Sequence, residues 1–234
     1  MAIVTISRQF GALGRPVGME LARRLGAEYL DRQLVAAVAD RAGLSVAEAE
    51  DYDERVPSLW QRLAAALTSG VPDPVMPPPP AGLEAGLATQ DRVDPHERLA
   101  ALTRAVICEA ADRGNVIILG RGGAFALGRR PGTLHVQLHA SIEDRVGFLA
   151  RRMAEIPVEE IPPDTRPDDD SLQALCEMMD ARRARYIRHH YDVDWMDPAN
   201  YDLSIDSGRL TMSTSVDLIE LAAHRVTSGA DYDG

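Results

Sequence analysis

The chain has 234 residues, 45% hydrophobic and 26% charged, which is the composition of a globular protein large enough to bury a core. Acidic residues number 36 against 25 basic ones, and the formal net charge of −11 argues against general affinity for nucleic acid or an anionic membrane. Because every basic residue is arginine, lysine chemistry is excluded, and any anion must be held by guanidinium groups, backbone N–H groups or a metal ion.

The N-terminal region predicts two strands, each followed by a helix. A β-rich run over residues 2–6 predicts the first strand, and a short second strand is expected over 28–31, followed by a helix over 34–41. The helix between the two strands has Pro16 at its first position and Gly26 at its end. Its apolar face repeats every four residues: Val17, Leu21 and Leu25.

A helical insertion is expected next, interrupted by a long loop. The pattern stays helical over 44–62, but residues 69–86 carry six prolines and several glycines, which no helix or central strand tolerates. We expect this proline-rich segment to be extended and to move unless a ligand or partner packs on it.

Regular elements then alternate to the end of the chain. The sequence first predicts a helix with apolar residues at 99, 102, 106 and 110, followed by strands over 116–119 and 134–138. A helix capped by Ser141 and a long helix over 172–186 are expected next. A strand over 201–205 and a helix over 211–226 complete the series. The five strands predict a three-layer α/β fold with a parallel sheet. Ligands of such sheets bind beyond the carboxyl ends of the strands.

A candidate phosphate-binding loop follows the first strand and directly precedes a helix. Gly11 and Gly14 allow several backbone N–H groups to face one anion, and the helix dipole favours negative charge. The candidate phosphate-binding residues are Gly11, Ala12, Leu13, Gly14, Arg15 and Pro16. The loop departs from the usual P-loop pattern, because Gln9 replaces the first glycine and neither Pro16 nor Val17 offers a hydroxyl group. From these residues alone, an ordinary glycine-bearing turn is an equal alternative.

Several motifs together resemble the cytidylate kinase-like family, relatives of the bacterial (d)CMP kinases among the P-loop nucleoside monophosphate (NMP) kinases. The motifs span residues 3–11 with Gly14-Arg15, residues 29–32, residues 118–122 and residues 201–210. The resemblance implies an NMP-kinase-like fold: a five-stranded parallel sheet flanked by helices, with a helical NMP-binding insertion and a short lid. The implied single domain has its core at 1–35, 98–150 and 200–228, the insertion with its proline-rich loop at 36–97, and a lid-type region at 151–192.

The resemblance also implies roles for particular residues. Gly11, Gly14 and Arg15 match the phosphate loop, with arginine in place of lysine, and Gly120-Arg121 matches the end of the third strand. Authentic CMP kinases continue there with an aspartate, whereas this chain has Gly122, so the identity of the acceptor stays open. The candidate acceptor-binding residues are Asp31, Arg32 and Arg121.

A stripe of arginines lies on the long helix. Arg182, Arg185 and Arg188 are spaced by three and match the arginine-rich lid helix of these kinases. With Arg15, Arg182 and Arg185 are the candidate catalytic residues, because phosphoryl transfer requires cations around the equatorial oxygens. The remaining candidate lid residues are Arg151, Arg152 and Arg188. From spacing alone, a solvated helix face paired with nearby carboxylates is the alternative.

The resulting hypothesis is a cytoplasmic kinase that uses Mg²⁺ with ATP and transfers the γ-phosphoryl group to a nucleotide or a similar small acceptor. We expect no metal-ligating residues and no nucleic-acid or membrane partner. A homodimer is left open. One alternative is a catalytically degenerate, nucleotide-responsive binding protein. Another is a scaffold that binds only a protein through the proline-rich loop.

Overall fold

The computed structural model describes residues 2–31, 37–38, 40–43, 95–154 and 168–227. Most of the expected insertion, including the proline-rich loop at 69–86, lies outside these residues, as do Arg32 and residues 155–167 of the lid-type region. Among the described helices, none has the length and apolar character needed to cross a membrane.

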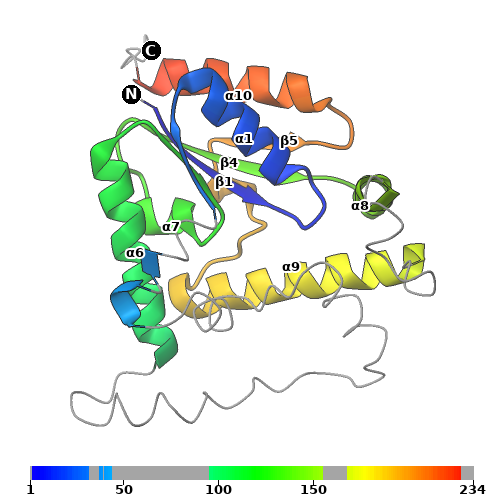
Figure 1. Ribbon diagram of the computed structural model, residues 1–234, viewed down its shortest axis with the longest axis horizontal. Helices are drawn as coiled ribbons and strands as arrows, with labels where there is room; N and C mark the ends of the chain where they lie inside the picture. The colour runs from blue at the N-terminus through cyan, green and yellow to red at the C-terminus, as the bar shows by residue number, and fades with distance from the viewer. Residues whose placement is uncertain (1, 32–36, 39, 44–94, 155–167, 228–234) are drawn as a thin grey trace.

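A parallel five-stranded sheet forms the centre of the fold, as predicted (Figure 1). The strands are β1 (Ile3–Arg8), β2 (Glu28–Leu30), β3 (Val116–Leu119), β4 (Thr133–His139) and β5 (Leu203–Asp206). They lie in the order β2-β3-β1-β4-β5. After β1, the chain first adds β2 and β3 on one side of β1 and then adds β4 and β5 on the other side. This switch of direction places the ligand-binding edge of the sheet at the carboxyl end of β1.

Helices α1 (Gly14–Leu25) and α10 (Met212–Thr227) cover one face of the sheet and lie side by side (Figure 1). Val17 and Leu21 of α1 and Val216 and Ile219 of α10 are fully buried against apolar side chains of β1 and β4. Gly26 ends α1 as predicted, with a left-handed backbone whose N–H donates to Ala22 O.

The start of α1 differs from the prediction. Pro16 was expected at the first helical position, but the helix begins two residues earlier, at Gly14. Proline is still tolerated there because the first four N–H groups of a helix have no partner within it.

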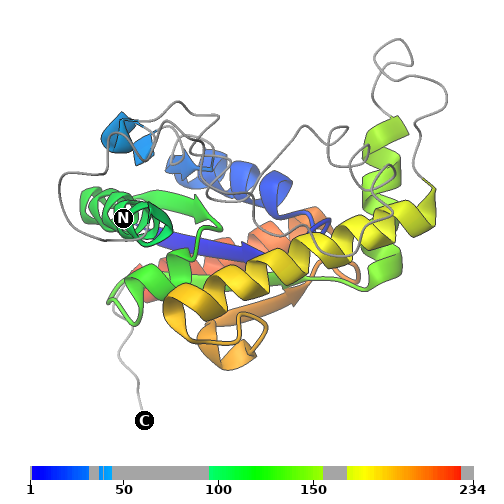
Figure 2. The same cartoon turned by 90° about the horizontal axis from the view of Figure 1, so that it is seen from below.

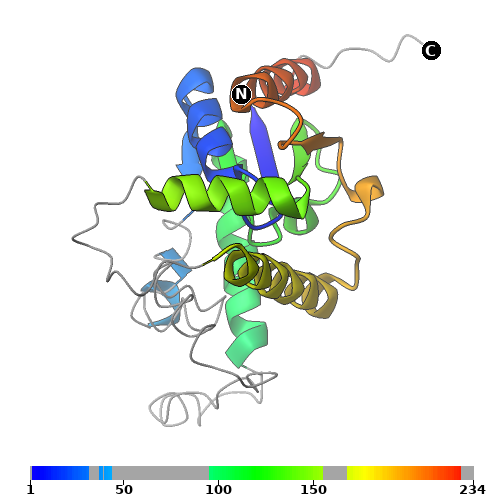
Figure 3. The same cartoon turned by 90° about the vertical axis from the view of Figure 1, so that its right-hand side faces the viewer.

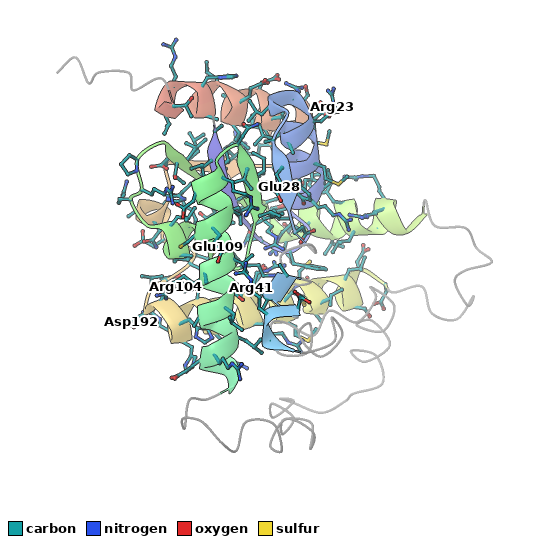
Figure 4. All side chains as sticks on the ribbon, turned by 60° about the vertical axis from the view of Figure 1, so that its left-hand side comes forward. Arg23, Glu28, Arg41, Arg104, Glu109 and Asp192 are labelled. Carbon is teal, nitrogen blue, oxygen red and sulfur yellow. The ribbon has the colours of Figure 1, made fainter. Side chains whose placement is uncertain are left out.

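Helix α6 (Pro95–Arg113) covers the other face of the sheet, beside the short α7 (Gly123–Leu127). The described helical residues at 37–38 and 40–42 join this layer, with Val38 buried in the same core. The two terminal nitrogens of Arg41, Nη1 and Nη2, donate to the Glu109 carboxylate, at 3.0 and 2.6 Å (Figure 4). This pair attaches the beginning of the expected insertion to α6.

Helices α8 (Ile142–Ala154) and α9 (Asp169–Tyr191) pack on each other and form a third apolar cluster (Figure 3). Ser141 caps α8 as predicted, since its hydroxyl accepts from Asp144 N at 3.1 Å. Leu175, Cys176 and Met179 of α9 are buried in this cluster. Figure 2 shows α9 passing close to the end of β1, so this helix borders the ligand-binding edge.

Two features of the fold were not predicted, and two strands have bounds that differ from the predicted ones. Strand β4 buries polar residues between its apolar ones: His135 Nδ1 lies 2.7 Å from the Thr5 hydroxyl, and Gln137 donates to Trp195 O. Helix α7 was missed because its five residues are too few to show a helical period. The first and last strands are displaced by one or two residues toward their carboxyl ends relative to the prediction.

Candidate functional site

The predicted phosphate-binding residues form the turn from β1 into α1. Gly11 and Leu13 have left-handed backbones, with φ of 85° and 55°, and α1 begins at Gly14. No side chain caps this helix and its first turn has no acidic residue, so its first N–H groups are suited to an anion. Arg15 extends from the second helical position and is exposed.

Polar groups from β4 and from the segment after β5 fix this turn. Gln9 N donates to Leu138 O at 3.0 Å, and the Gln9 side-chain oxygen accepts from Ala140 N at 3.1 Å. On the other side, the buried Ser207 hydroxyl lies 3.1 Å from Ala12 O and 3.1 Å from His139 O. The loop backbone is therefore held in place by residues far away in the sequence.

A buried ion cluster fixes the same loop from α8 and α9. Asp180 Oδ1 accepts from Phe10 N at 2.8 Å, and Asp180 Oδ2 accepts from Arg145 Nη1 at 2.6 Å. Arg183 Nη1 donates to Asp180 Oδ1 and to Arg8 O, both at 3.2 Å, while Arg145 Nη1 lies 3.3 Å from Phe10 O. One carboxylate and two guanidinium groups thus bind three backbone groups of the loop.

Burial raises the pKa of Asp180, while the Phe10 N–H group and the two guanidinium groups oppose that rise. The ionised carboxylate thus depends on these partners. Arg145 and Arg183 are themselves almost fully buried, at 7% and 8% exposure. Asp180 thus pairs with both of these buried guanidinium groups directly behind the loop.

A second turn follows β3 and has an unusual backbone. Gly120, Arg121 and Gly122 are three successive left-handed residues, with φ of 75°, 57° and 69°. This conformation costs an L-residue about 1 to 2 kcal/mol, so Arg121 is held in it by its neighbours. A Cβ atom on Gly122 would lie 2.7 Å from the Tyr191 ring, which means that α9 closes over the turn.

A pocket lies between the carboxyl ends of β1 and β3. Three arginines from three elements line it: Arg8 of β1, Arg121 of the turn and Arg183 of α9. Its other lining residues are Ser7, Gly120, Gly122, Phe125, Tyr186, Ile187 and Trp195. The pocket therefore combines guanidinium groups with an aromatic and aliphatic wall, which suits a small molecule that carries both a negative charge and an apolar part.

The side chain of Arg8 connects the turn between β1 and α1, the candidate phosphate loop, with this pocket. A Cβ atom on Gly14 would lie 2.6 Å from Arg8 Cγ, and a Cβ atom on Gly120 would overlap the Arg8 guanidinium group. The side chain thus passes over the first residue of α1 and ends beside the turn after β3. Two glycines leave the space that it occupies.

The other predicted acceptor residues lie beyond the end of β2. Asp31 is half-buried, and Arg32 lies outside the described residues. Burial raises the pKa of the neighbouring Tyr29 to about 12, and Asp31 adds to this rise while Arg15 and Arg8 oppose it. Charges of both signs therefore surround the Tyr29 hydroxyl near this edge of the sheet.

The arginines predicted for the lid and for catalysis on α8 and α9 are not among the residues that line this pocket. Arg182 is half-buried, while Arg185 and Arg188 are exposed. Arg151 and Arg152 are exposed at the end of α8, and the Arg151 guanidinium carbon stands 4.9 Å from the Phe148 ring centroid. Their assignment to the lid and to catalysis remains a prediction.

Sequence reasoning missed the residues that hold the loop and reach the pocket: Arg8, Arg145, Asp180, Arg183 and Ser207. A signal existed for Arg183, which occupies a position of the apolar stripe of its helix together with Leu172, Leu175 and Met179. An arginine on such a face is buried, and a buried arginine needs a carboxylate or carbonyl partner. Arg145 and Ser207 gave no such signal, since their partners are distant in the sequence.

The described residues around the site show no set of side chains that would hold a magnesium ion by themselves. Pro16 and Val17 of α1 offer no hydroxyl, and no group of three His, Cys, Asp or Glu side chains among the described residues is arranged to hold a metal. Mg²⁺ commonly keeps several waters and binds phosphate oxygens. Here the nucleotide phosphates and water would supply most of its ligands.

At the end of α9, the Arg104 guanidinium carbon stands 5.1 Å from the centroid of the Tyr191 ring, and Figure 4 shows Arg104 on α6 beside the Asp192 end of α9. Phe125 packs on the same ring at 5.6 Å between centroids. These contacts fix the end of α9 against α6 and α7, on the side of the pocket formed by Phe125.

Among solved structures, the chain is similar to an uncharacterized protein from Eubacterium ventriosum, with 15% identity and a TM-score of 0.61 over 96% of this chain and 99% of that one. The chain is also similar to a shikimate kinase from Bacteroides thetaiotaomicron, with 16% identity and a TM-score of 0.49 over 95% of this chain and 98% of that one. A third similarity is to a shikimate kinase from Acinetobacter baumannii in complex with shikimate, with 12% identity and a TM-score of 0.45 over 99% of this chain and 96% of that one.

No curated protein matches the chain. The model of the cytidylate kinase-like family matches residues 3–209, which include both turns and all five strands. The motifs that suggested this family from the sequence lie at the carboxyl ends of β1, β2, β3 and β5, around the site described above. The chain belongs to the cytidylate kinase-like family.

Proposed function

We propose that this protein is a phosphotransferase that moves the γ-phosphoryl group of ATP, with Mg²⁺, to a nucleoside monophosphate or a similar small anionic acceptor. The observation that carries the proposal is the juxtaposition of two sites. An uncapped helix N-terminus with a glycine-bearing loop adjoins an arginine-lined pocket at the carboxyl ends of neighbouring strands. Membership of the cytidylate kinase-like family supports the same activity.

The nucleotide side of the proposed site is the loop at residues 11–14 with Arg15. The first N–H groups of α1 bind phosphate oxygens, and the Arg15 guanidinium group adds two donors in a fixed plane. The ion cluster of Asp180, Arg145 and Arg183 holds the loop in shape, so binding of the triphosphate requires little reordering of its backbone.

The acceptor side is the pocket beside Arg121. It gathers three guanidinium groups in a chain with a net charge of −11, whose overall charge repels anions. Phe125, Tyr186 and Trp195 provide the apolar wall against which the uncharged part of the acceptor packs.

The chemical step joins the two sides. An acceptor oxygen forms a bond to the γ-phosphorus as the bond to the β–γ bridging oxygen breaks, which gives ADP and the phosphorylated acceptor. Such transfers depend on positioning and on cations around the transferred group. Arg8 and Arg121 on one side and Arg15 on the other supply these cations, and bound Mg²⁺ supplies further charge neutralisation.

A second candidate function is nucleotide-responsive binding without turnover. The bulkier Arg15 in place of the P-loop lysine, and the absence of a hydroxyl at Pro16 and Val17, favour it. Both functions require ATP binding, so ADP formation distinguishes them.

The test is ADP formation by the purified protein with Mg-ATP and a panel of ribo- and deoxyribonucleoside monophosphates, compared with ATP alone. The proposal expects acceptor-dependent ADP release that Arg121→Ala reduces and Arg23→Ala, an exposed arginine at the far end of α1, does not. Clear ATP binding by calorimetry with no acceptor-dependent turnover would favour the second candidate.

A further inference from the structure

Helix α10 leaves apolar side chains exposed outside the site described above. Among the described residues, five large hydrophobic side chains are exposed, and four of them lie on α10: Met212, Leu218, Leu221 and Val226. Leu218 is 41% exposed and Leu221 is 58% exposed, and their spacing of three residues makes them neighbours on the helix surface. An apolar patch of this kind on a globular protein marks a candidate interaction site.

The two leucines lie on the side of α10 that faces away from α1. The other side is occupied, because Arg24 of α1 donates to Asp217 at 2.6 Å and to Glu220 at 3.1 Å. On the leucine side, α10 borders β5, which is the last strand of the described sheet. Figure 3 shows β5 beneath α10 at this outer edge. An edge strand leaves one row of its backbone groups without a strand partner.

A groove runs between this edge strand and α10. Its apolar lining comes from β5, α10 and the segment between them: Leu203, Ile205, Leu210, Leu218, Leu221 and Ala222. One face of the molecule therefore carries both a hollow and exposed apolar side chains beside it. A twofold axis brings such a face against itself, so that the leucines of each copy meet the hollow of the other.

The charged residues of the groove lie toward its opposite ends. Helix α10 runs back against the direction of the strands, so the start of β5 lies beside the end of α10 (Figure 1). Arg225, in the last turn of α10, lies toward this end, and Asp206, the last residue of β5, lies toward the other. Asp206 Oδ1 accepts from Gly208 N and Arg209 N, and within the described part of the chain neither Asp206 nor Arg225 has an ion pair.

We propose that this face is the interface of a homodimer, in which a second copy of the chain docks about a twofold axis. Leu218 and Leu221 of each copy enter the groove of the other, and Arg225 of each copy pairs with the other copy's Asp206. Complementary charges at both ends of the groove fix one orientation of the two copies. The net charge of −11 disfavours an anionic membrane as the occupant. The inference is independent of the proposed function, because this face includes neither the pocket nor the loop.

Sedimentation velocity of the purified full chain, from about 1 to 100 µM, tests the proposal. The wild type should reach twice the chain mass of 25.5 kDa. Leu221→Glu puts a carboxylate into the apolar interface and should raise the dimer Kd by at least about 100-fold. Because Leu221 is exposed in the single chain, this variant should fold, which circular dichroism checks. Met19→Glu, at an exposed position of α1, is the matched control and should stay dimeric.

Asp206→Asn and Arg225→Gln test the orientation of the two copies. Asparagine keeps the Oδ1 acceptor for Gly208 N and Arg209 N and removes only the charge. Each single variant should raise the dimer Kd by about 2- to 30-fold, since each breaks both ion pairs of the dimer. The double variant should show little further loss, because the same pairs are already broken.

A monomeric wild type at about 100 µM would overturn the proposal. Wild-type dimerisation of Leu221→Glu, or equal dissociation of Met19→Glu, would also overturn it, since neither result depends on this face. Additive losses in Asp206→Asn and Arg225→Gln would refute the pairing of these residues across the axis and with it the docked orientation. Flotation of a monomeric wild type with phosphatidylcholine vesicles, abolished by Leu221→Glu, would assign the face to a lipid surface instead.

Discussion

The phosphate loop and the Gly120–Gly122 turn flank the same side chain, that of Arg8, but they are held in different ways. The loop is fixed by partners from α8, α9, β4 and the end of β5, many of them charged or polar and buried. The turn holds its shape through three successive left-handed residues, with Arg8 and Tyr191 packed where side chains of its glycines would be.

This difference separates two sources of pre-organisation. The shape of the loop depends on ionised groups that must stay paired, so loss of one partner should affect the whole protein. The shape of the turn depends on space and backbone conformation, so its disturbance should be local and should depend on the side chains that pack against it.

Removal of the Asp180 carboxylate should have the largest effect on stability. Asp180→Ala leaves Arg145 and Arg183 buried without their carboxylate and Phe10 N without its acceptor, which should cost about 3 to 5 kcal/mol. Urea unfolding measures this cost. Asp217→Ala, which breaks an equally short but exposed ion pair with Arg24, should have a much smaller effect. Similar effects of the two substitutions would show that the buried cluster is not what holds the loop.

Alanine at Gly120 should separate backbone strain from contact with Arg8. Gly120→Ala puts a Cβ on a residue with φ of 75°, which costs about 1 to 2 kcal/mol, and also pushes against the Arg8 guanidinium group. In an Arg8→Ala background the second effect disappears, so a double-mutant cycle should give a coupling free energy of about 0.5 to 3 kcal/mol.

The control for this cycle is Gly26→Ala. Gly26 is left-handed as well, with φ of 57°, but a Cβ there would meet no atom within 4 Å. It should show the backbone cost alone and no coupling to Arg8. Coupling of equal size at Gly26 and Gly120 would contradict the position given to the Arg8 side chain.

The hydroxyl of Ser207 should contribute a smaller amount to the loop. Ser207→Ala removes one buried donor shared by Ala12 O and His139 O, and we expect a loss of about 0.5 to 1.5 kcal/mol in thermal or urea unfolding. Because Ala12 belongs to the phosphate loop, ATP affinity should fall as well. Ser204→Ala, whose hydroxyl donates to Gln137 Oε1 and makes no bond to the loop, should lower stability only and leave ATP affinity unchanged. An unchanged ATP affinity in Ser207→Ala would mean that Ala12 is positioned without this bond.

The sheet and most helices could be predicted because their signals are local. The continuous apolar run at 116–119 and the spacing of Val17, Leu21 and Leu25 follow directly from strand and helix geometry. The position of the candidate phosphate-binding loop followed in the same way, from a strand, two glycines and a helix start. Helix α7 and the left-handed turn before it could not be predicted, since their conformation depends on packing against Thr5, Ile118 and Tyr191.

The site was only partly predictable for a related reason. Arg121 lines the pocket, at the strand end that Gly120 and Gly122 mark in the sequence, while its role in binding the acceptor stays a prediction. The side chains that hold the loop are far from their partners in the sequence. Arg145 is 35 residues from Asp180, and Ser207 is 195 residues from Ala12. A single sequence carries no sign of such pairs, although an arginine at position 183 on an apolar helix face already indicated one buried ion pair.

The most direct test of the two-sided site measures binding affinities by calorimetry in the variants Arg15→Ala and Arg121→Ala. The two ligands, measured separately, are ATP and the acceptor identified in the ADP assay. The account predicts that Arg15→Ala weakens ATP binding by about 10- to 100-fold and leaves acceptor affinity unchanged, while Arg121→Ala does the reverse. Unaltered ATP affinity in folded Arg15→Ala would show that the loop after β1 is a structural turn. Loss of the same ligand in both variants would contradict the division of the site into a nucleotide side and an acceptor side.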